Sequence, residues 1–341
     1  MPKPVQLPQP YLIFLGDVTE GAYAKTAFGL RDWAPERCTG EYALPTATVS
    51  AGLPTLTPAQ ARAQGARAMV IGIASPGGAL PDTWVPPLLE ALNAGLDLIG
   101  GLHARLGSHP QLKAAAERLE RQLIDIREPP KNIPIGAGAK RSGRRLLTVG
   151  TDCALGKKYT ALSLTRAMRE KGLDAVFRAT GQTGILIAGA GIPIDAVVAD
   201  FVAGAAEMLT PNAPEEHWDV VEGQGSIFHP SYAGVSLGLL HGTQPDVIVL
   251  CHEAGRDQLK GVPGYATPSL EEAIALHLRL ARRTNSRVRC AGVSLNTSCL
   301  TAEQAAVVLA AHSARLRLPV ADPIRGGTQF ESLVAACLDF K

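Results

Sequence analysis

One segment, residues 146–162, constrains the fold of this 341-residue chain more than any other. It reads LLTVGTDCALGKKYTAL: an apolar run predicts a strand, a loop with two glycines follows, and lysines begin the next stretch. The order strand, glycine loop and helix start brings unpaired backbone N–H groups and the positive end of a helix dipole to one point, where phosphate groups bind. We therefore expect Gly150 and Gly156 to let the loop fold round a phosphate and Lys157 to add positive charge.

The spacing of this loop differs from the usual nucleotide-binding pattern GxxxxGK[ST]. Five residues separate Gly150 from Gly156, and Lys158 stands where a Ser or Thr normally binds magnesium. The segment therefore predicts a phosphate site and disfavours a magnesium–nucleotide site.

Short apolar runs alternate with helical segments along the chain, the pattern of parallel sheets covered by helices. The predicted strands are residues 11–15, 68–73, 96–99, 146–149, 175–178, 219–221, 246–251, 288–293 and 318–321. The predicted helices are residues 111–122, 157–171, 270–282 and 301–311. The fold class that follows is α/β with two doubly wound domains: an N-terminal Rossmann-like domain over residues 1–128 and a C-terminal P-loop NTPase-like parallel sheet over residues 146–341.

Residues 129–145 separate these domains and have the composition of a linker, rich in Pro, Gly and cations. We interpret the basic residues in it, Lys140, Arg141, Arg144 and Arg145, as a solvated cluster. The N-terminal domain has a Gly/Pro loop at residues 74–82, directly after a strand, where open sheets bind ligands. It has no GxGxxG motif, so a dinucleotide site is not predicted there.

Composition excludes several classes of protein. Lys and Arg total 33 against 31 Asp and Glu, a net charge of +2, so no nucleic-acid partner is expected. No run of eighteen apolar residues and no signal-peptide pattern occurs, which predicts a cytoplasmic protein without a membrane partner. The six cysteines form no CxxC pair, so we expect them to be core residues. The absence of GxSxG argues against a serine hydrolase.

Polar residues follow several of the predicted strands at their carboxyl ends, where parallel sheets place active sites. Glu222 and His229 are the candidates for acid–base chemistry, although His229, next to a proline, would alternatively cap a turn. Candidate substrate-binding residues are Arg178, Gln182, Thr183, Ser226, His252 and Arg256. The two arginines suit a carboxylate or phosphate, and each could instead be a structural ion-pair partner.

Three segments resemble dethiobiotin synthetase and the cobyrinate amidase-type enzymes. GTDCALGK is similar to their phosphate loop, VEGQGS at 221–226 to their VEGxGG, and GVSLNT at 292–297 to a strand end that contacts adenine. The resemblance implies roles for Asp152 and Glu222 beside a metal and for Asn296 beside adenine. The cofactor-binding residues it implies are Gly150, Thr151, Cys153, Gly156, Lys157, Lys158, Tyr159 and Asn296.

Over nearly its whole length the chain resembles the D-glutamate N-acetyltransferases of the DgcN type. The segments that carry this resemblance are AKTAFGL (24–30), MVIGIASPGGALPDTW (69–84), GLDLIGGLH (95–103), the modified phosphate loop, RATGQTG, EGQGSIFHPSYAGVSLGLLHG (222–242) and PDVIVLCHE (245–253). The resemblance implies acetyl transfer from acetyl-CoA to the amino group of D-glutamate. Coenzyme A carries an adenine and a pyrophosphate, which a loop of nucleotide-binding type can hold.

Two alternatives remain open. An Mg-ATP-dependent carboxylate ligase is favoured by Asp152 and Glu222 and disfavoured by Lys158, so the metal is unassigned. A non-catalytic metabolite sensor is disfavoured by the polar cluster at the strand ends. We expect a small-molecule substrate and a homo-oligomer, with the N-terminal half covering the site or forming the subunit interface.

Overall fold

The structure is a computed structural model, and it describes residues 7–75 and 78–339. The chain forms two compact units. Among the described residues, the N-terminal unit comprises those from Leu7 to Pro129 together with Gln182–Pro193, and the C-terminal unit comprises Pro130–Gly181 and those from Ile194 to Asp339. Both units are built on sheets whose neighbouring strands all run parallel.

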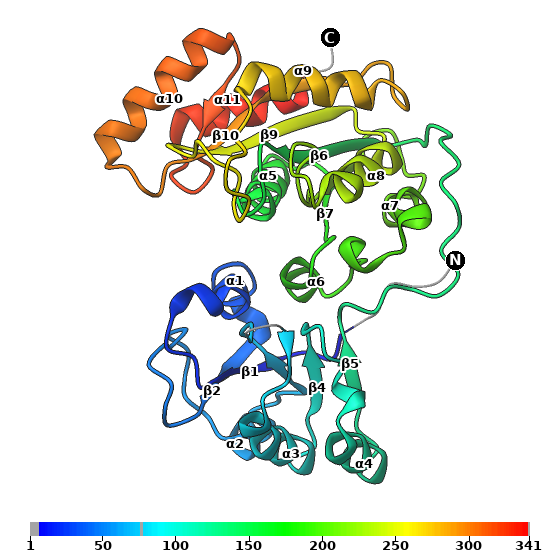
Figure 1. Cartoon of the computed structure of the whole chain (residues 1–341), viewed down its shortest axis with the longest axis vertical. Coiled ribbons are helices and arrows are strands. Elements are labelled where there is room, and N and C mark those ends of the chain that lie inside the picture. Colours follow the sequence, from blue (N-terminus) through cyan, green and yellow to red (C-terminus); the bar gives the residue numbers. More distant parts are fainter. Residues whose placement is uncertain (1–6, 76–77, 340–341) are drawn as a thin grey trace. The chain divides into compact units, whose positions relative to one another are not determined.

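The N-terminal unit has a five-stranded sheet of order β2-β1-β3-β4-β5. Its strands and α-helices up to Pro129 are β1 (Tyr11–Gly16), α1 (Lys25–Trp33), β2 (Cys38–Ala43), α2 (Pro58–Ala63), β3 (Ala68–Ile71), α3 (Val85–Asn93), β4 (Asp97–Gly100), α4 (Pro110–Leu119) and β5 (Leu123–Asp125). In Figure 1, α2, α3 and α4 lie on one face of this sheet and α1 on the other. The central strands β1 and β3 are buried throughout, since apolar residues occupy both of their faces.

A helix from the second half of the sequence, α6 (Gln182–Ala188), completes the N-terminal unit. It packs against α1 on the same face of the sheet (Figure 1). The hydroxyls of Thr26 and Thr183 lie 2.9 Å apart, and the Tyr11 hydroxyl donates to the Leu186 carbonyl at 3.5 Å. The apolar residues of α6 are buried. A segment that lies beyond residue 180 in the sequence therefore belongs to the hydrophobic core of the N-terminal sheet.

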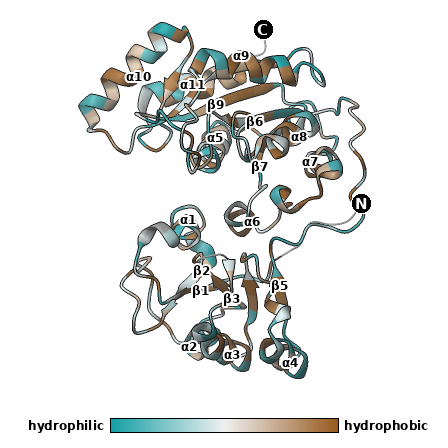
Figure 2. Ribbon diagram, viewed as in Figure 1, coloured by the Kyte–Doolittle hydropathy of each residue, from teal (hydrophilic) through white to brown (hydrophobic). Residues whose placement is uncertain are grey.

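The C-terminal unit has a six-stranded sheet of order β11-β10-β9-β6-β8-β7. Its elements are β6 (Arg144–Gly150), α5 (Lys157–Glu170), β7 (Ala175–Arg178), α7 (Val202–Leu209), β8 (Trp218–Val221), α8 (Ala233–Thr243), β9 (Val247–Glu253), α9 (Leu270–Ala281), β10 (Arg289–Asn296), α10 (Ala302–Leu316), β11 (Val320–Ala321) and α11 (Gly327–Leu338). Figure 2 shows hydrophobic residues concentrated in the strands of both units. Among the described residues, none of the helices combines the length and apolar character needed to cross a membrane.

The predicted strands and helices are confirmed, with shifts of a few residues at their ends. Two strands were not predicted, β2 and β5, which form the edges of the N-terminal sheet. Edge strands are half exposed and carry polar residues: β2 reads CTGEYA, and β5 has three residues. Neither shows the continuous apolar run that identified the buried strands.

The interpretation of the basic cluster as solvated is wrong for two of its members. Arg145 is fully buried, and its guanidinium donates to the carbonyls of Arg141, Ser142 and Gly143. Arg141 donates at 2.6 Å to the Thr210 carbonyl and at 2.7 Å to the Gly242 carbonyl. These guanidiniums satisfy backbone carbonyls that would otherwise be buried without a partner.

The expectation that the cysteines are core residues is wrong for some of them. All six are free thiols; Cys251 and Cys337 are buried, but Cys299 is exposed and the other three are half-buried.

Candidate functional site

The predicted phosphate loop connects β6 to α5. Gly156 precedes the helix in a left-handed conformation, φ 102°, and offers no side chain to cap the first turn. A helix start without a side-chain cap has the geometry that binds anions. The loop wraps the Lys157 side chain, whose ammonium donates to the Asp152 carbonyl at 2.8 Å. Burial lowers the pKa of Lys157, so an anion in the loop would favour its charged form.

The position after Lys157 carries a second cation instead of the hydroxyl that binds magnesium in nucleotide sites. The Lys158 ammonium lies 4.7 Å from the centre of the Tyr159 ring. The nearest serine or threonine hydroxyl along the helix, that of Thr160, lies 2.8 Å from the Ser294 hydroxyl and donates to the Gly156 carbonyl. The loop thus offers positive charge where a metal ligand would be needed.

Asp152 forms a buried ion pair with Arg256. One oxygen of its fully buried carboxylate accepts from the Arg256 guanidinium at 2.8 Å and from the Lys260 N–H at 2.8 Å, and the other accepts from the Cys153 N–H at 2.6 Å. Burial raises the pKa of Asp152, but these donors outweigh it and hold the pKa below its usual value. Arg256 also donates to the Cys153 carbonyl at 2.9 Å and pairs with Glu253. Both residues brace the loop, which fits the structural alternative for Arg256.

Asp152, Cys153 and His229 place one possible metal-ligand atom each within 4.8 Å of one another. Both ring nitrogens of His229 are already engaged, Nδ1 by the Ser231 N–H at 3.2 Å and Nε2 by the Lys260 carbonyl at 3.3 Å. Burial raises the pKa of the Cys153 thiol, which keeps it protonated. With the Asp152 oxygens also occupied, the cluster does not fit a cation. His229 lies buried in a turn, as the turn-capping alternative predicts.

Glu222 directly follows β8 and lies beside the phosphate loop. One of its oxygens accepts from the N–H groups of Thr180 at 3.0 Å and Gly181 at 3.1 Å. Burial raises the pKa of this carboxyl, although Lys158 and the two N–H donors act in the opposite direction. The next residue must be glycine, because a Cβ at Gly223 would lie 1.8 Å from the Thr148 carbonyl oxygen. A buried carboxyl with a raised pKa suits a general base.

Three of the other predicted residues have hydrogen-bond or ion-pair partners within the protein. Arg178 is paired with Asp219 at 2.5 Å, so its structural alternative is observed. His252 lies 2.8 Å from the Thr151 hydroxyl, and burial lowers its pKa to about 4, which keeps it neutral. The Asn296 side chain accepts from the Ser298 N–H at 3.0 Å, at the end of β10.

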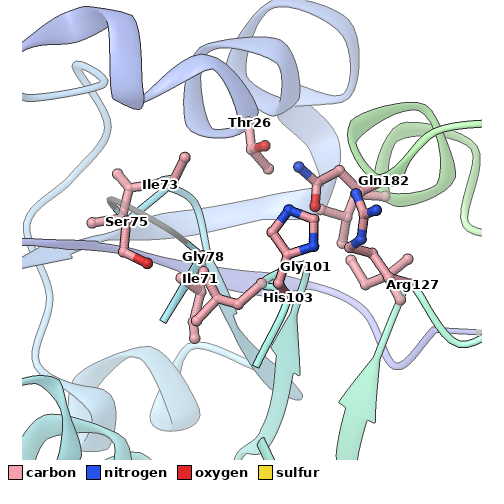
Figure 3. Close-up of a pocket in the computed structure, with 13 residues that line it drawn as sticks. Thr26, Ile71, Ile73, Ser75, Gly78, Gly101, His103, Arg127 and Gln182 are labelled. Atoms are coloured by element: carbon pink, nitrogen blue, oxygen red, sulfur yellow. The ribbon is translucent and has the colours of Figure 1, made fainter. Parts of the chain in front are cut away.

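The three remaining predicted substrate-binding residues belong to different units of the structure. Ser226 is buried and accepts from the Phe228 N–H at 3.2 Å. Gln182 and Thr183 belong to α6 and therefore to the N-terminal unit, whereas the sequence grouped them with residues of the C-terminal unit. Gln182 also lines a cavity of about 340 Å³ in the N-terminal unit, together with His103 (Figure 3).

Two contributors to the loop were missed. The Thr148 hydroxyl oxygen accepts from the Gly223 N–H at 2.9 Å, and the single polar residue inside the run LLTV was the available signal. Lys260 contributes through its backbone N–H, which no side-chain pattern can reveal.

Two domain models match the chain. A domain of unknown function described as the P-loop domain of DUF1611 matches residues 134–334, and the Rossmann-like domain DUF1611_N matches residues 36–129. The chain belongs to the DUF1611 family. The predicted fold class, two α/β domains of Rossmann-like and P-loop type, is confirmed by this membership and by the parallel sheets.

Relatives of this DUF1611 protein align with it almost from end to end. A D-glutamate N-acetyltransferase of Tritonibacter scottomollicae is 48% identical over 318 residues, which is 93% of this chain and 96% of the relative. A D-glutamate N-acetyltransferase of a Pseudoalteromonas species is 45% identical over 331 residues, 97% of this chain and 99% of the relative. The crystal structure of a DUF1611 family protein from Anabaena variabilis superposes with a TM-score of 0.86 at 33% identity, covering 97% of this chain and 99% of that one.

Proposed function

We propose that this chain is an N-acetyltransferase that moves the acetyl group of acetyl-CoA to the amino group of D-glutamate. The observation that carries the proposal is the 45–48% identity, over more than nine tenths of the chain, to two relatives named D-glutamate N-acetyltransferase. The geometry of the phosphate loop supports it independently.

Acetyl-CoA presents phosphates and needs no metal to be held. The loop between β6 and α5 offers a helix start without a side-chain cap, the positive end of a helix dipole and two successive lysines. Magnesium-bound ATP would need a hydroxyl at position 158 and a carboxylate with open oxygens. Lys158 occupies the first place, and Asp152 is paired with Arg256 at 2.8 Å. The loop therefore favours a phosphate-bearing carrier over a magnesium–nucleotide complex.

Acetyl transfer requires the ammonium of the acceptor to lose one proton to a base, which passes it to solvent, before the lone pair attacks the thioester carbonyl. The new C–N bond forms, the C–S bond breaks, and the second proton, which the nitrogen loses as the amide forms, ends on the departing thiolate of coenzyme A. Glu222 is the residue that we assign as the base, because its carboxyl is buried beside the loop and its pKa is raised. His229 is less suited, since hydrogen bonds engage both of its ring nitrogens.

The test is a thiol-release assay with acetyl-CoA and D-glutamate, with L-glutamate as the matched acceptor. The expected result is stoichiometric release of coenzyme A thiol with N-acetyl-D-glutamate as product. Release of ADP from ATP and magnesium with a carboxylate substrate, and no thiol release, would replace the proposal by the ligase alternative.

A further inference from the structure

Helix α10 (Ala302–Leu316) exposes an apolar face that the site described above does not involve. It packs against β11, the edge strand of the C-terminal sheet, and lies at the margin of that unit in Figure 1. Its buried residues are Ala305 and Leu309. On the opposite side, five exposed apolar residues form what we call the α10 face: Ala306, Val307, Ala310, Ala311 and Ala314. A helix that is apolar on all sides is normally covered on all sides.

The neighbouring helix α9 shows the usual arrangement of a surface helix. Its first turn exposes Glu271 and Glu272, and its last turn exposes Arg279. Charged residues of this kind keep the solvent side of a helix hydrated. The α10 face consists of alanines and a valine that is 69% exposed, which is the composition of a surface that another protein covers.

Two exposed polar residues lie between Glu303 and Arg317, and both have partners within the C-terminal unit. The Gln304 side chain accepts from the Thr301 N–H at 3.0 Å, as part of the capping box that begins the helix. The Arg315 guanidinium lies 3.3 Å from the carboxylate of Glu271 on α9. These side chains therefore flank the α10 face and leave its centre apolar.

The apolar surface continues past the start of the helix. Ile324, in the loop between β11 and α11, is 67% exposed. The next residue, Arg325, donates to the Leu300 carbonyl at 2.7 Å and so holds this loop beside the residues that precede α10. Val307 and Ile324 are among the most exposed of the large apolar side chains that the structure describes.

Charges of opposite sign stand at the two ends of the α10 face. Residues three or four apart follow one line along a helix, and such a line runs from Glu303 through Val307, Ala310 and Ala314 to Arg317. Glu303 precedes Ala310 by seven residues, and Arg317 follows it by seven. If two copies of the helix pack antiparallel and cross at Ala310, each Glu303 therefore lies opposite an Arg317 of the other copy. Parallel packing would place like charges together.

We propose that the α10 face is an interface between two copies of this chain, in which α10 packs antiparallel on the α10 of the second copy. Both copies use the same patch, as a twofold axis through Ala310 requires. The alanines allow the two helix axes to approach to about 8 Å, the lower end of the range for packed helices. The two Glu303–Arg317 pairs fix the direction and register of the helices, because any other register separates them.

Ala310→Glu tests the centre of this interface. The side chain is exposed in the single chain, so the substitution should leave the fold intact, which circular dichroism checks. On the twofold axis, the new carboxylate would meet its own copy in an apolar surrounding. By sedimentation equilibrium, wild type should contain an even number of chains, and Ala310→Glu should have half its mass. Ala335→Glu, at an exposed alanine of α11, is the matched control and should keep the mass of wild type. A monomeric wild type, or an Ala310→Glu variant with the mass of wild type, would overturn the proposal.

Charge reversal tests the antiparallel register. Glu303→Arg and Arg317→Glu should each raise the dissociation constant of the dimer about tenfold, because each replaces two attractive pairs by two repulsive ones. The double variant carries both reversals and restores opposite charges across the interface, so it should associate nearly as tightly as wild type. Two single variants without effect, or a double variant weaker than both, would show that these residues do not face each other and would refute the antiparallel packing.

Discussion

Replacing Arg256 with alanine distinguishes two roles for its guanidinium, a brace for the phosphate loop and a clamp for the substrate. The structure supports the brace. Asp152 is fully buried, and the Arg256 side chain, 17% exposed, donates to it at 2.8 Å and to the Cys153 carbonyl at 2.9 Å. Removal of the arginine would leave a buried carboxylate without its cation.

The expected loss of stability follows from this geometry. Removing one partner of a buried ion pair costs about 3–5 kcal/mol. Asp152 would keep its donors from the backbone of Lys260 and Cys153, so we expect a cost near the lower limit, about 3 kcal/mol. The pKa of Asp152 lies below its ordinary 3.8 in the folded protein. The stability due to the pair is therefore full at neutral pH and is lost as the pH falls through the folded-state pKa.

The assay is urea unfolding at pH 7 and at pH 3, followed by tryptophan fluorescence, in which Trp218 reports the C-terminal unit. Arg283→Ala, an exposed arginine of the same unit, is the control and should unfold like wild type. A double-mutant cycle with Asp152→Asn should give a coupling energy on the order of 2 kcal/mol. If Arg256→Ala left the stability unchanged and raised the KM for D-glutamate, the role in bracing the loop would be refuted and the role in binding substrate would be supported.

Two other variants test the site, and a third tests His277, a buried residue of α9. Glu222→Gln keeps an acceptor for the two backbone N–H groups, so we expect the turnover rate to fall about 100-fold or more in the thiol-release assay. The raised pKa of Glu222 means that its ionised carboxyl destabilises the folded protein as the pH rises above 4.5. Glu222→Gln should therefore melt at a higher temperature than wild type at pH 7 and at the same temperature near pH 4. Full activity of this variant would exclude Glu222 as the base. Lys158→Thr should raise the KM for acetyl-CoA about fivefold in steady-state kinetics, the equivalent of about 1 kcal/mol, and an unchanged KM would place the phosphates elsewhere. Burial lowers the pKa of His277 from 6.5 to about 4, so wild type should lose stability on the order of 3 kcal/mol as the unfolded chain is protonated between those pH values. His277→Leu should remove that part of the pH dependence in thermal melts, and parallel curves would contradict it.

The regular elements of the central sheets could be predicted because their sequence pattern is local. Apolar runs such as residues 247–251 have no polar face, and only a strand covered on both sides accommodates them. The phosphate loop could be predicted for the same reason, since strand, glycine and lysine follow one another within the seventeen residues 146–162. Edge strands and the partners of side chains depend on long-range packing, which such patterns do not encode.

The roles of individual charged residues show this limit. Arg178, Arg256 and Asp152 stand at strand ends, where sequence reasoning expects ligand contacts. Their actual partners lie far along the chain: Asp219 is 41 residues from Arg178, and Arg256 is 104 residues from Asp152. A sequence can indicate that a buried charge needs a partner, but it does not say whether the partner is a ligand or another part of the protein.

The placement of α6 has a consequence for how such a protein can be inherited. The two domain models meet between residues 129 and 134, yet Gln182–Pro193 packs with the unit before that boundary. A recombination event there would transfer an N-terminal sheet without the helix that completes its core. Exchange of either domain at this boundary would therefore separate α6 from the sheet on which it packs. Both must pass together from ancestor to descendant, in keeping with relatives that align over 93% and 97% of the chain.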